Sequence, residues 1–339
     1  MVSITKTSMW ARRSALISIL ILAAASASAR ERKSIEPPDI YDFGPDEQVR
    51  ARIDAPPTHC FVGQPLVVPI TLSNHTRHPI TLATNMVPRG YLKVTIHRSG
   101  RSGRSYYGPY IPGIYAPSDL PMLPLDEVTL KALIWADLKT ESGLAFEEPG
   151  RYQLEFEVKV EIAEAESREG RIPLGRIDVV VEPTPEALRP MVDALRRHEG
   201  AFAAVHRGLF PEGMEEAMPR LVRSVPTNPI TPYLLYAMAG RDKVLWTRDK
   251  SNRQLADSTL MLLQSVAQSD SVFKLQAWEG TLRFLDELGQ ARACEAVART
   301  LVEVTPPERL GRIGDHELLI KYLLNTQEVD RSRLWWLLP

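Results

Sequence analysis

The clearest pattern along the chain is a strict alternation of apolar and polar residues over 152–160. The apolar positions are Tyr152, Leu154, Phe156, Val158 and Val160. This period of two predicts a β-strand that is buried on one face only. Pro149 and Gly150 come directly before it, and this pair favours a tight turn in which the glycine takes a positive φ. A sheet must therefore contain this strand.

Six further segments show the same alternation or a short apolar run. With the first strand, the predicted set is 49–53, 66–72, 80–82, 92–96, 128–135, 152–160 and 177–181. Roughly seven short strands separated by turn signals favour an antiparallel sandwich over a parallel α/β fold. Pro69 interrupts the second segment and cannot donate a hydrogen bond. That strand must lie at a sheet edge, or the amide position of Pro69 must face away from a neighbour.

The period changes to helical spacing after Glu182. Thr184 is expected to cap a helix that has Pro185 at its first position and ends before Gly200, with Pro190 bending it or delaying its start. Shorter helical pieces follow over 201–249, and 255–266 is a cleaner amphipathic helix. Residues 270–306 have the pattern of two antiparallel helices joined at Gly289.

Two family resemblances accompany these patterns. Phe61-Val-Gly-Gln-Pro-Leu, Ile70-Thr-Leu-Ser-Asn74, Leu123-Pro-Leu-Asp126 and Pro149-Gly-Arg-Tyr152 resemble the layout of immunoglobulin-like sandwiches in bacterial extracytoplasmic proteins. The layout is also similar to the sandwich of an intracellular bacterial proteinase-inhibitor family. The likeness spans Val49 to Glu182, and the excursion over 98–115 departs from it.

The helical part resembles a degenerate tetratricopeptide-type hairpin. The matching positions are Trp278, Leu285, Gly289, Cys294, Ala298 and Pro306, whereas Leu282 stands where that repeat prefers a small residue. One unit is recognisable, and a solenoid needs about three units to bury its faces. The neighbouring helices are then divergent copies or a different bundle.

We therefore predict an all-β plus all-α chain with two domains. An immunoglobulin-like antiparallel β-sandwich spans 49–182, and a helical hairpin-repeat domain spans 184–339. Residues 30–48 form a linker or an N-terminal arm, because they are rich in proline and acids without periodicity.

Residues 1–29 have the order of a secretory signal peptide. Lys6, Arg12 and Arg13 precede an apolar run over 15–25 and the small residues Ala27-Ser-Ala29. That run is shorter than the roughly 20 residues of a spanning helix. We expect cleavage before Arg30, no membrane span in the mature chain and a secreted or periplasmic location; an uncleaved anchor is the alternative.

Charge and cysteine content narrow the function classes. The formal net charge is −1, and removing a signal that has three basic and no acidic residues takes it to −4, so nucleic acid is an unsuitable partner. Cys60 and Cys294 lie in different predicted domains. The two cysteines either form one disulfide bridge, which an oxidising compartment would permit, or remain two buried thiols. The second interpretation is favoured.

No catalytic motif, phosphate-binding loop, dinucleotide fingerprint or metal-ligand spacing stands in the sequence. We therefore predict no catalytic, cofactor-binding or metal-binding residues. The candidate ligand-binding residues form one arginine- and tyrosine-rich segment: Arg98, Arg101, Arg104, Tyr106, Tyr107 and Tyr110, with Tyr115 beyond them. Guanidinium groups bind anions by forked hydrogen bonds, and tyrosines supply amphipathic contact area. The alternative for this segment is a solvated hairpin tip.

These patterns favour a non-enzymatic binding protein whose partner is a protein or a glycan. The alternative is an enzyme or a proteinase-inhibitor-like protein whose site lies at the domain junction. Replacing Arg98, Arg101 and Arg104 by serine is expected to weaken partner capture without changing thermal stability.

Overall fold

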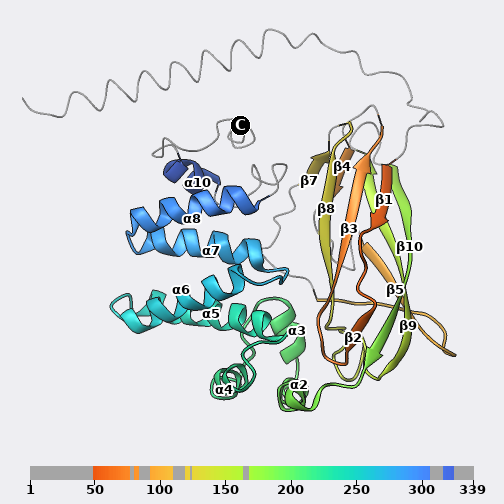
Figure 1. Cartoon of the computed structure of the whole chain (residues 1–339), viewed down its shortest axis with the longest axis horizontal. Coiled ribbons are helices and arrows are strands. Elements are labelled where there is room, and N and C mark those ends of the chain that lie inside the picture. The colour runs from red at the N-terminus through yellow and green to blue at the C-terminus, as the bar shows by residue number, and fades with distance from the viewer. Residues whose placement is uncertain are drawn as a thin grey trace, which may run out of the picture. The chain divides into compact units, whose positions relative to one another are not determined.

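The computed structural model describes residues 49–76, 80–83, 92–109, 119–122, 124–162, 168–305 and 316–323. Contact clustering divides the chain into Met1–Pro45 and Asp46–Pro339, and every described residue belongs to the second unit. The described strands all precede Glu186 and the described helices follow it, so the chain combines sheets with helices in that order (Figure 1).

Ten described strands form two sheets. Their bounds are β1 Val49–Ile53, β2 His59–Phe61, β3 Leu66–Asn74, β4 Ile80–Ala83, β5 Leu92–Arg98, β6 Arg104–Ser105, β7 Asp119–Met122, β8 Glu127–Ile134, β9 Gly150–Ile162 and β10 Arg168–Glu182. One sheet has the order β1-β3-β8, and the other has the order β2-β10-β9-β4-β7, with β5 pairing to β9 and β6. The pairs are antiparallel except for β2 with β10, which is parallel and departs from the antiparallel prediction.

The position of Pro69 resolves one of the alternatives left by the sequence. Strand β3 is central, not an edge, because it pairs with both β1 and β8. Strand β1 ends at Ile53 opposite Ile70, so Pro69 lies just beyond that ladder, and its carbonyl accepts a hydrogen bond from the Asp54 amide at 3.1 Å. A proline is tolerated there because the ladder has already ended.

The described helices follow in a single run. A 3-10 turn, η1 Glu186–Leu188, leads into eight α-helices: α2 Arg189–Arg197, α3 Ala201–His206, α4 Ala217–Ser224, α5 Thr231–Arg248, α6 Arg253–Ala267, α7 Lys274–Glu287, α8 Ala291–Val304 and α10 His316–Leu323. Helices α5 to α8 and α10 each contact the next in chain order (Figure 1).

The predicted helices are present, with one local difference. Thr184 does not cap the first helix, because its hydroxyl donates to the Val62 carbonyl at 2.7 Å and so ties the strand end to β2. Pro190 delays the helix start to Arg189. A later helix, α6, does have a side-chain cap: the Asn252 side chain accepts a hydrogen bond from the Leu255 amide at 3.1 Å. Gly289 has a φ of 71° between α7 and α8, as the hairpin pattern predicts.

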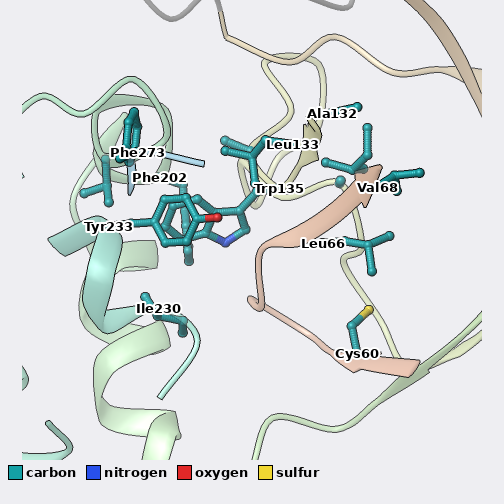
Figure 2. Packing of buried hydrophobic residues seen from close by; sticks show 14 of the residues in the cluster. Cys60, Leu66, Val68, Ala132, Leu133, Trp135, Phe202, Ile230, Tyr233 and Phe273 are labelled. Atoms are coloured by element: carbon teal, nitrogen blue, oxygen red, sulfur yellow. The ribbon is translucent and has the colours of Figure 1, made fainter. Parts of the chain in front are cut away.

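One buried apolar cluster is shared by the strands and the first helices (Figure 2). It continues from the sheet residues Leu66 and Phe156 through Trp135 to Phe202 and Tyr233 of the helices. Figure 2 shows the indole of Trp135 reaching toward Tyr233. The division into separate sandwich and helical domains stays a prediction, and any such division must cross this cluster.

The strands and the helices also approach closely at Gly63. This glycine has a φ of 91°, and a Cβ atom there would lie 2.9 Å from the methyl groups of Val192 on α2. A side chain would therefore collide with α2 as well as strain the backbone.

Both Cys60 and Cys294 are buried and unpaired in the structure, and burial raises the pKa of Cys60 to about 12.

Candidate functional site

Arg98 and Arg101 lie at the turn that joins β5 to β6, and Glu148 is the acidic partner of both. The Arg98 guanidinium donates to the Glu148 carboxylate and to the Pro149 carbonyl at 3.2 Å. Arg101 stands farther off, 3.9 Å from the same carboxylate, with 67% of its side chain exposed. The bond to Arg98 lowers the pKa of Glu148. Glu148 is therefore an ionised acceptor at neutral pH and is unsuited to act as a proton donor.

Arg104 is part of a half-buried ion pair. Its guanidinium donates to the Asp137 carboxylate and to the Ala145 carbonyl at 2.5 Å. The Asp137 side chain is 0% exposed, whereas the Arg104 side chain is 37% exposed. The other carboxylate oxygen of Asp137 accepts the Lys139 amide at 3.0 Å. Asp137 therefore fixes both the arginine and the turn that begins at residue 137.

This contact changes the expected outcome of replacing Arg104. We predict that Arg104→Ser lowers the free energy of unfolding by about 3 kcal/mol, because it leaves the buried Asp137 carboxylate without its cation. Urea denaturation measures this change. Arg101→Ser is the matched control, since Arg101 and its partner Glu148 are both exposed and exposed pairs contribute about 0–1 kcal/mol. Equal losses for the two variants would contradict a structural role for the Arg104–Asp137 pair.

The three candidate tyrosines have different positions. Tyr106 is buried, and its hydroxyl donates to the Leu133 carbonyl at 3.3 Å and accepts from the Trp135 amide at 3.1 Å, so it belongs to the core. Burial raises its pKa. Tyr107 is half-buried beneath the Lys139 ammonium, which lies 5.8 Å from its ring centre. Tyr110, like Tyr115, lies outside the described residues.

Three hollows that share lining residues lie beside these arginines. The first hollow, of about 130 Å³, is bounded by Arg98, Arg101 and Tyr152. A shallow central hollow of about 730 Å³ shares Arg104, Glu147 and Glu148 with the first. A third hollow of about 360 Å³ shares Thr140, Glu141, Ser142 and Arg196 with the second, and reaches Leu195 and Phe202 on α2 and α3. We call these three hollows the charged groove.

The turn over 137–144 forms one wall of the charged groove and is well braced. The Thr140 hydroxyl donates to the Leu144 carbonyl at 2.9 Å, and the Gly143 amide donates to the Thr140 carbonyl at 3.2 Å. The Ser142 hydroxyl donates to Glu147 at 3.1 Å. The exposed side chains of Leu138 and Lys139 are thus carried on an ordered backbone.

Four residues of the charged groove lie outside the segment that the sequence patterns indicate: Asp137, Leu138, Lys139 and Arg196. A single acid directly after the apolar run 132–136 was a usable signal for Asp137, because a carboxylate at the end of a buried strand needs a cationic partner. No local pattern points to Arg196, which arrives from helix α2.

Asn74-His75-Thr76 has the sequence of an N-glycosylation acceptor. The Asn74 side chain is buried, its Nδ2 donates to the Met122 carbonyl at 2.9 Å and its Oδ1 accepts from the Thr76 amide at 2.9 Å, so its amide nitrogen is not accessible in the fold. Within the described residues, no cluster of three His, Cys, Asp or Glu side chains could hold a metal ion. None of the helices in the described part combines the length and apolarity that crossing a membrane requires.

The chain has little similarity to known proteins. No family model and no curated protein matches the chain. Among solved structures, a β-glucosidase from Listeria innocua matches with 12% identity and a TM-score of 0.23, over 45% of this chain and 20% of that chain. A CARDB domain from Pyrococcus furiosus, solved with two metal ions, matches with 13% identity and a TM-score of 0.21, over 42% of this chain and 95% of that one. Such scores transfer neither a fold nor an activity.

Proposed function

We propose that this chain is an exported, non-enzymatic binding protein of the cell envelope that recognises a protein or glycan partner through the charged groove. The finer architecture that goes with this proposal is an immunoglobulin-like β-sandwich followed by a helical hairpin repeat. Sandwich loops and repeat helices both commonly present binding surfaces. Secreted or periplasmic location follows from the signal-like residues 1–29.

The observation that carries the proposal is the arrangement of charges along the groove. Two of its carboxylates, Asp137 and Glu148, are ion-paired with arginines. Because these pairs hold the carboxylates in place and ionised, they fit a fixed recognition surface better than acid–base catalysis. The groove is also broad and shallow at its centre, where basic and acidic side chains line it in equal number. Such a surface suits contact with a macromolecule.

The test is capture of partners from an envelope extract by the immobilised chain that starts at Arg30. We predict that the double variant Arg98→Ser, Arg101→Ser retains markedly less of the captured material, because it removes basic groups that open onto the groove. Arg104 is kept because its pair with Asp137 is structural. The thermal midpoint should fall only slightly, since Arg101 forms one exposed pair and Arg98 loses a pair with the exposed Glu148 and one hydrogen bond to the Pro149 carbonyl.

Arg223→Ser with Arg248→Ser is the matched control, because it removes two exposed cations from α4 and α5 outside the groove. Its capture should equal that of the unchanged chain. Undiminished capture by the groove variant would exclude the groove as the binding surface.

The alternative is an enzyme or proteinase-inhibitor-like protein. Its site would be the hollow of about 360 Å³ between the turn 137–143 and helices α2 and α3, where strands meet helices. An inhibitor would slow a purified protease in proportion to its concentration, and a Lys139→Ser variant on the exposed turn would lose that effect.

A further inference from the structure

Helix α10 is the last described helix, and it packs against α8 and α7 (Figure 1). Its apolar side chains Leu319, Tyr322 and Leu323 are buried. They form an apolar cluster with residues of α7 and α8, namely Leu282, Leu285, Cys294, Val297, Ala298, Leu301 and Val302. This cluster is separate from the one that the strands and the first helices share, and Trp278 borders both. The departure of α10 would therefore leave the main core in place.

One carboxylate on α7 ties α10 to the helices beneath it. Asp286 accepts a hydrogen bond from the Tyr322 hydroxyl and another from Lys321 Nζ at 2.6 Å. The bond from Lys321 is the main reason that the pKa of Asp286 is lowered. The Lys321 and Asp286 side chains are 57% and 32% exposed, so water reaches the pair and weakens it. Asp286 is thus an anchor of modest strength.

The docking of α10 is a balance of opposing terms. A helix of eight residues does not persist alone in water, so α10 is ordered only while it is docked. Docking gains from the burial of three large side chains and from the Asp286 anchor, and it costs the conformational entropy of ordering the helix. Helices α6, α7 and α8 each have a neighbour on both sides, whereas α10 ends the described series. An element at the end of a stack opens at a lower free energy than its core.

The thiol of Cys294 lies between α7 and α10. Its Sγ is 3.8 Å from the Leu282 carbonyl of α7, and its other polar neighbour is the Tyr322 hydroxyl of α10. The side chain is 0% exposed, and burial raises the pKa of the thiol. A thiol reagent therefore reaches Cys294 from molecules in which α10 has moved away.

We propose that α10 is a releasable cap, which leaves α7 and α8 as a unit while the rest of the chain stays folded, and that Asp286 sets how often it leaves. Release opens the apolar faces of α7 and α8 together with the Cys294 thiol. The cap thereby controls access to this end of the helical run. It does not depend on the charged groove or on the proposed binding function.

The test measures how fast iodoacetamide modifies Cys294 in the folded full chain, with mass spectrometry to separate it from Cys60. Dividing the rate in the urea-unfolded chain by the rate in the folded chain gives the protection of the thiol, and urea denaturation gives the equilibrium constant for unfolding of the whole chain. We expect the protection of Cys294 to be smaller than that constant by about tenfold or more, because the cap opens without global unfolding. Protection equal to the constant for global unfolding would overturn the proposal.

Two variants on α7 test the anchor. Asp286→Asn should raise the rate at Cys294 about tenfold and leave the rate at Cys60 unchanged, because Lys321 loses its ion pair and Tyr322 bonds to a neutral acceptor. Glu287→Gln is the matched control, since Glu287 pairs with Lys243 of α5 at 2.8 Å and not with α10. It should leave the rate at Cys294 as it is in the unchanged chain. Equal rates at Cys294 in the two variants would show that Asp286 does not hold the cap.

Discussion

Replacing Trp135 by alanine is expected to lower the free energy of unfolding by about 4 kcal/mol, the range for deleting a large buried aromatic side chain. Trp135 is 1% exposed. Its ring centre lies 5.7 Å from that of Phe202 and 5.1 Å from that of Tyr233, and its Nε1 donates to the Gly63 carbonyl at 2.8 Å. The variant would therefore open a cavity where strands and helices share their core, and urea denaturation would measure the loss.

Two further variants make the Trp135 result specific. Trp135→Phe keeps much of the ring contact but leaves the Gly63 carbonyl without its donor, so we expect a loss of about 1–2 kcal/mol. Val244→Ala is the surface control, because Val244 is exposed on α5 and such changes stay within about 0.5 kcal/mol. A Trp135→Ala variant as stable as the Val244→Ala variant would mean that the junction contributes little to folding.

The second large effect is a loss of stability in acid that originates at His206. This residue is buried on α3, its Nδ1 accepts a hydrogen bond from the Ala136 amide at 3.3 Å, and its ring stacks on Trp135 with centres 6.3 Å apart. Burial lowers the pKa of His206 from 6.5 to about 3. The folded state therefore holds this imidazole neutral.

The direction of the effect follows from the two pKa values. Well above pH 6.5 the imidazole is neutral in both states and the stability is fully present. Between pH 6.5 and about 3 the unfolded chain binds a proton that the folded chain excludes, so stability falls as the pH falls. The slope is about 1.4 kcal/mol for each pH unit, and the loss approaches about 5 kcal/mol across the window.

His206→Gln is the informative comparison, because glutamine is neutral at every pH and retains a polar acceptor. Urea denaturation at several pH values between 7.5 and 4 should show the unchanged chain losing stability more steeply than the variant, by about 1.4 kcal/mol for each unit below 6.5. Parallel pH profiles for the two proteins would show that His206 does not titrate in this way. The absolute stability of the variant at neutral pH is a separate quantity and does not bear on the slope.

In the candidate site, the local sequence predicts which residues form an exposed turn, whereas strand pairing decides which of them reach the core. The tract 98–107 identifies Arg98 and Arg101 as surface cations because glycine, serine and arginine in that density favour an exposed turn. The same composition predicts that Arg104 and Tyr106 lie on the surface with them. Strand pairing decides otherwise: Ile96 pairs with Arg104, which brings Arg104 to Asp137, and Tyr106 passes into the core.

The sequence by itself determined the order and kind of the elements, because side-chain periodicity is a local property. The alternation over 152–160 is strand β9, the change after Glu182 separates strands from helices, and Gly289 joins α7 to α8. Only the tertiary structure decided which charges meet. Arg98 is 50 residues from Glu148 and Arg104 is 33 residues from Asp137, so their pairing depends on how the strands and turns come together, and the charged groove exists only in the folded chain.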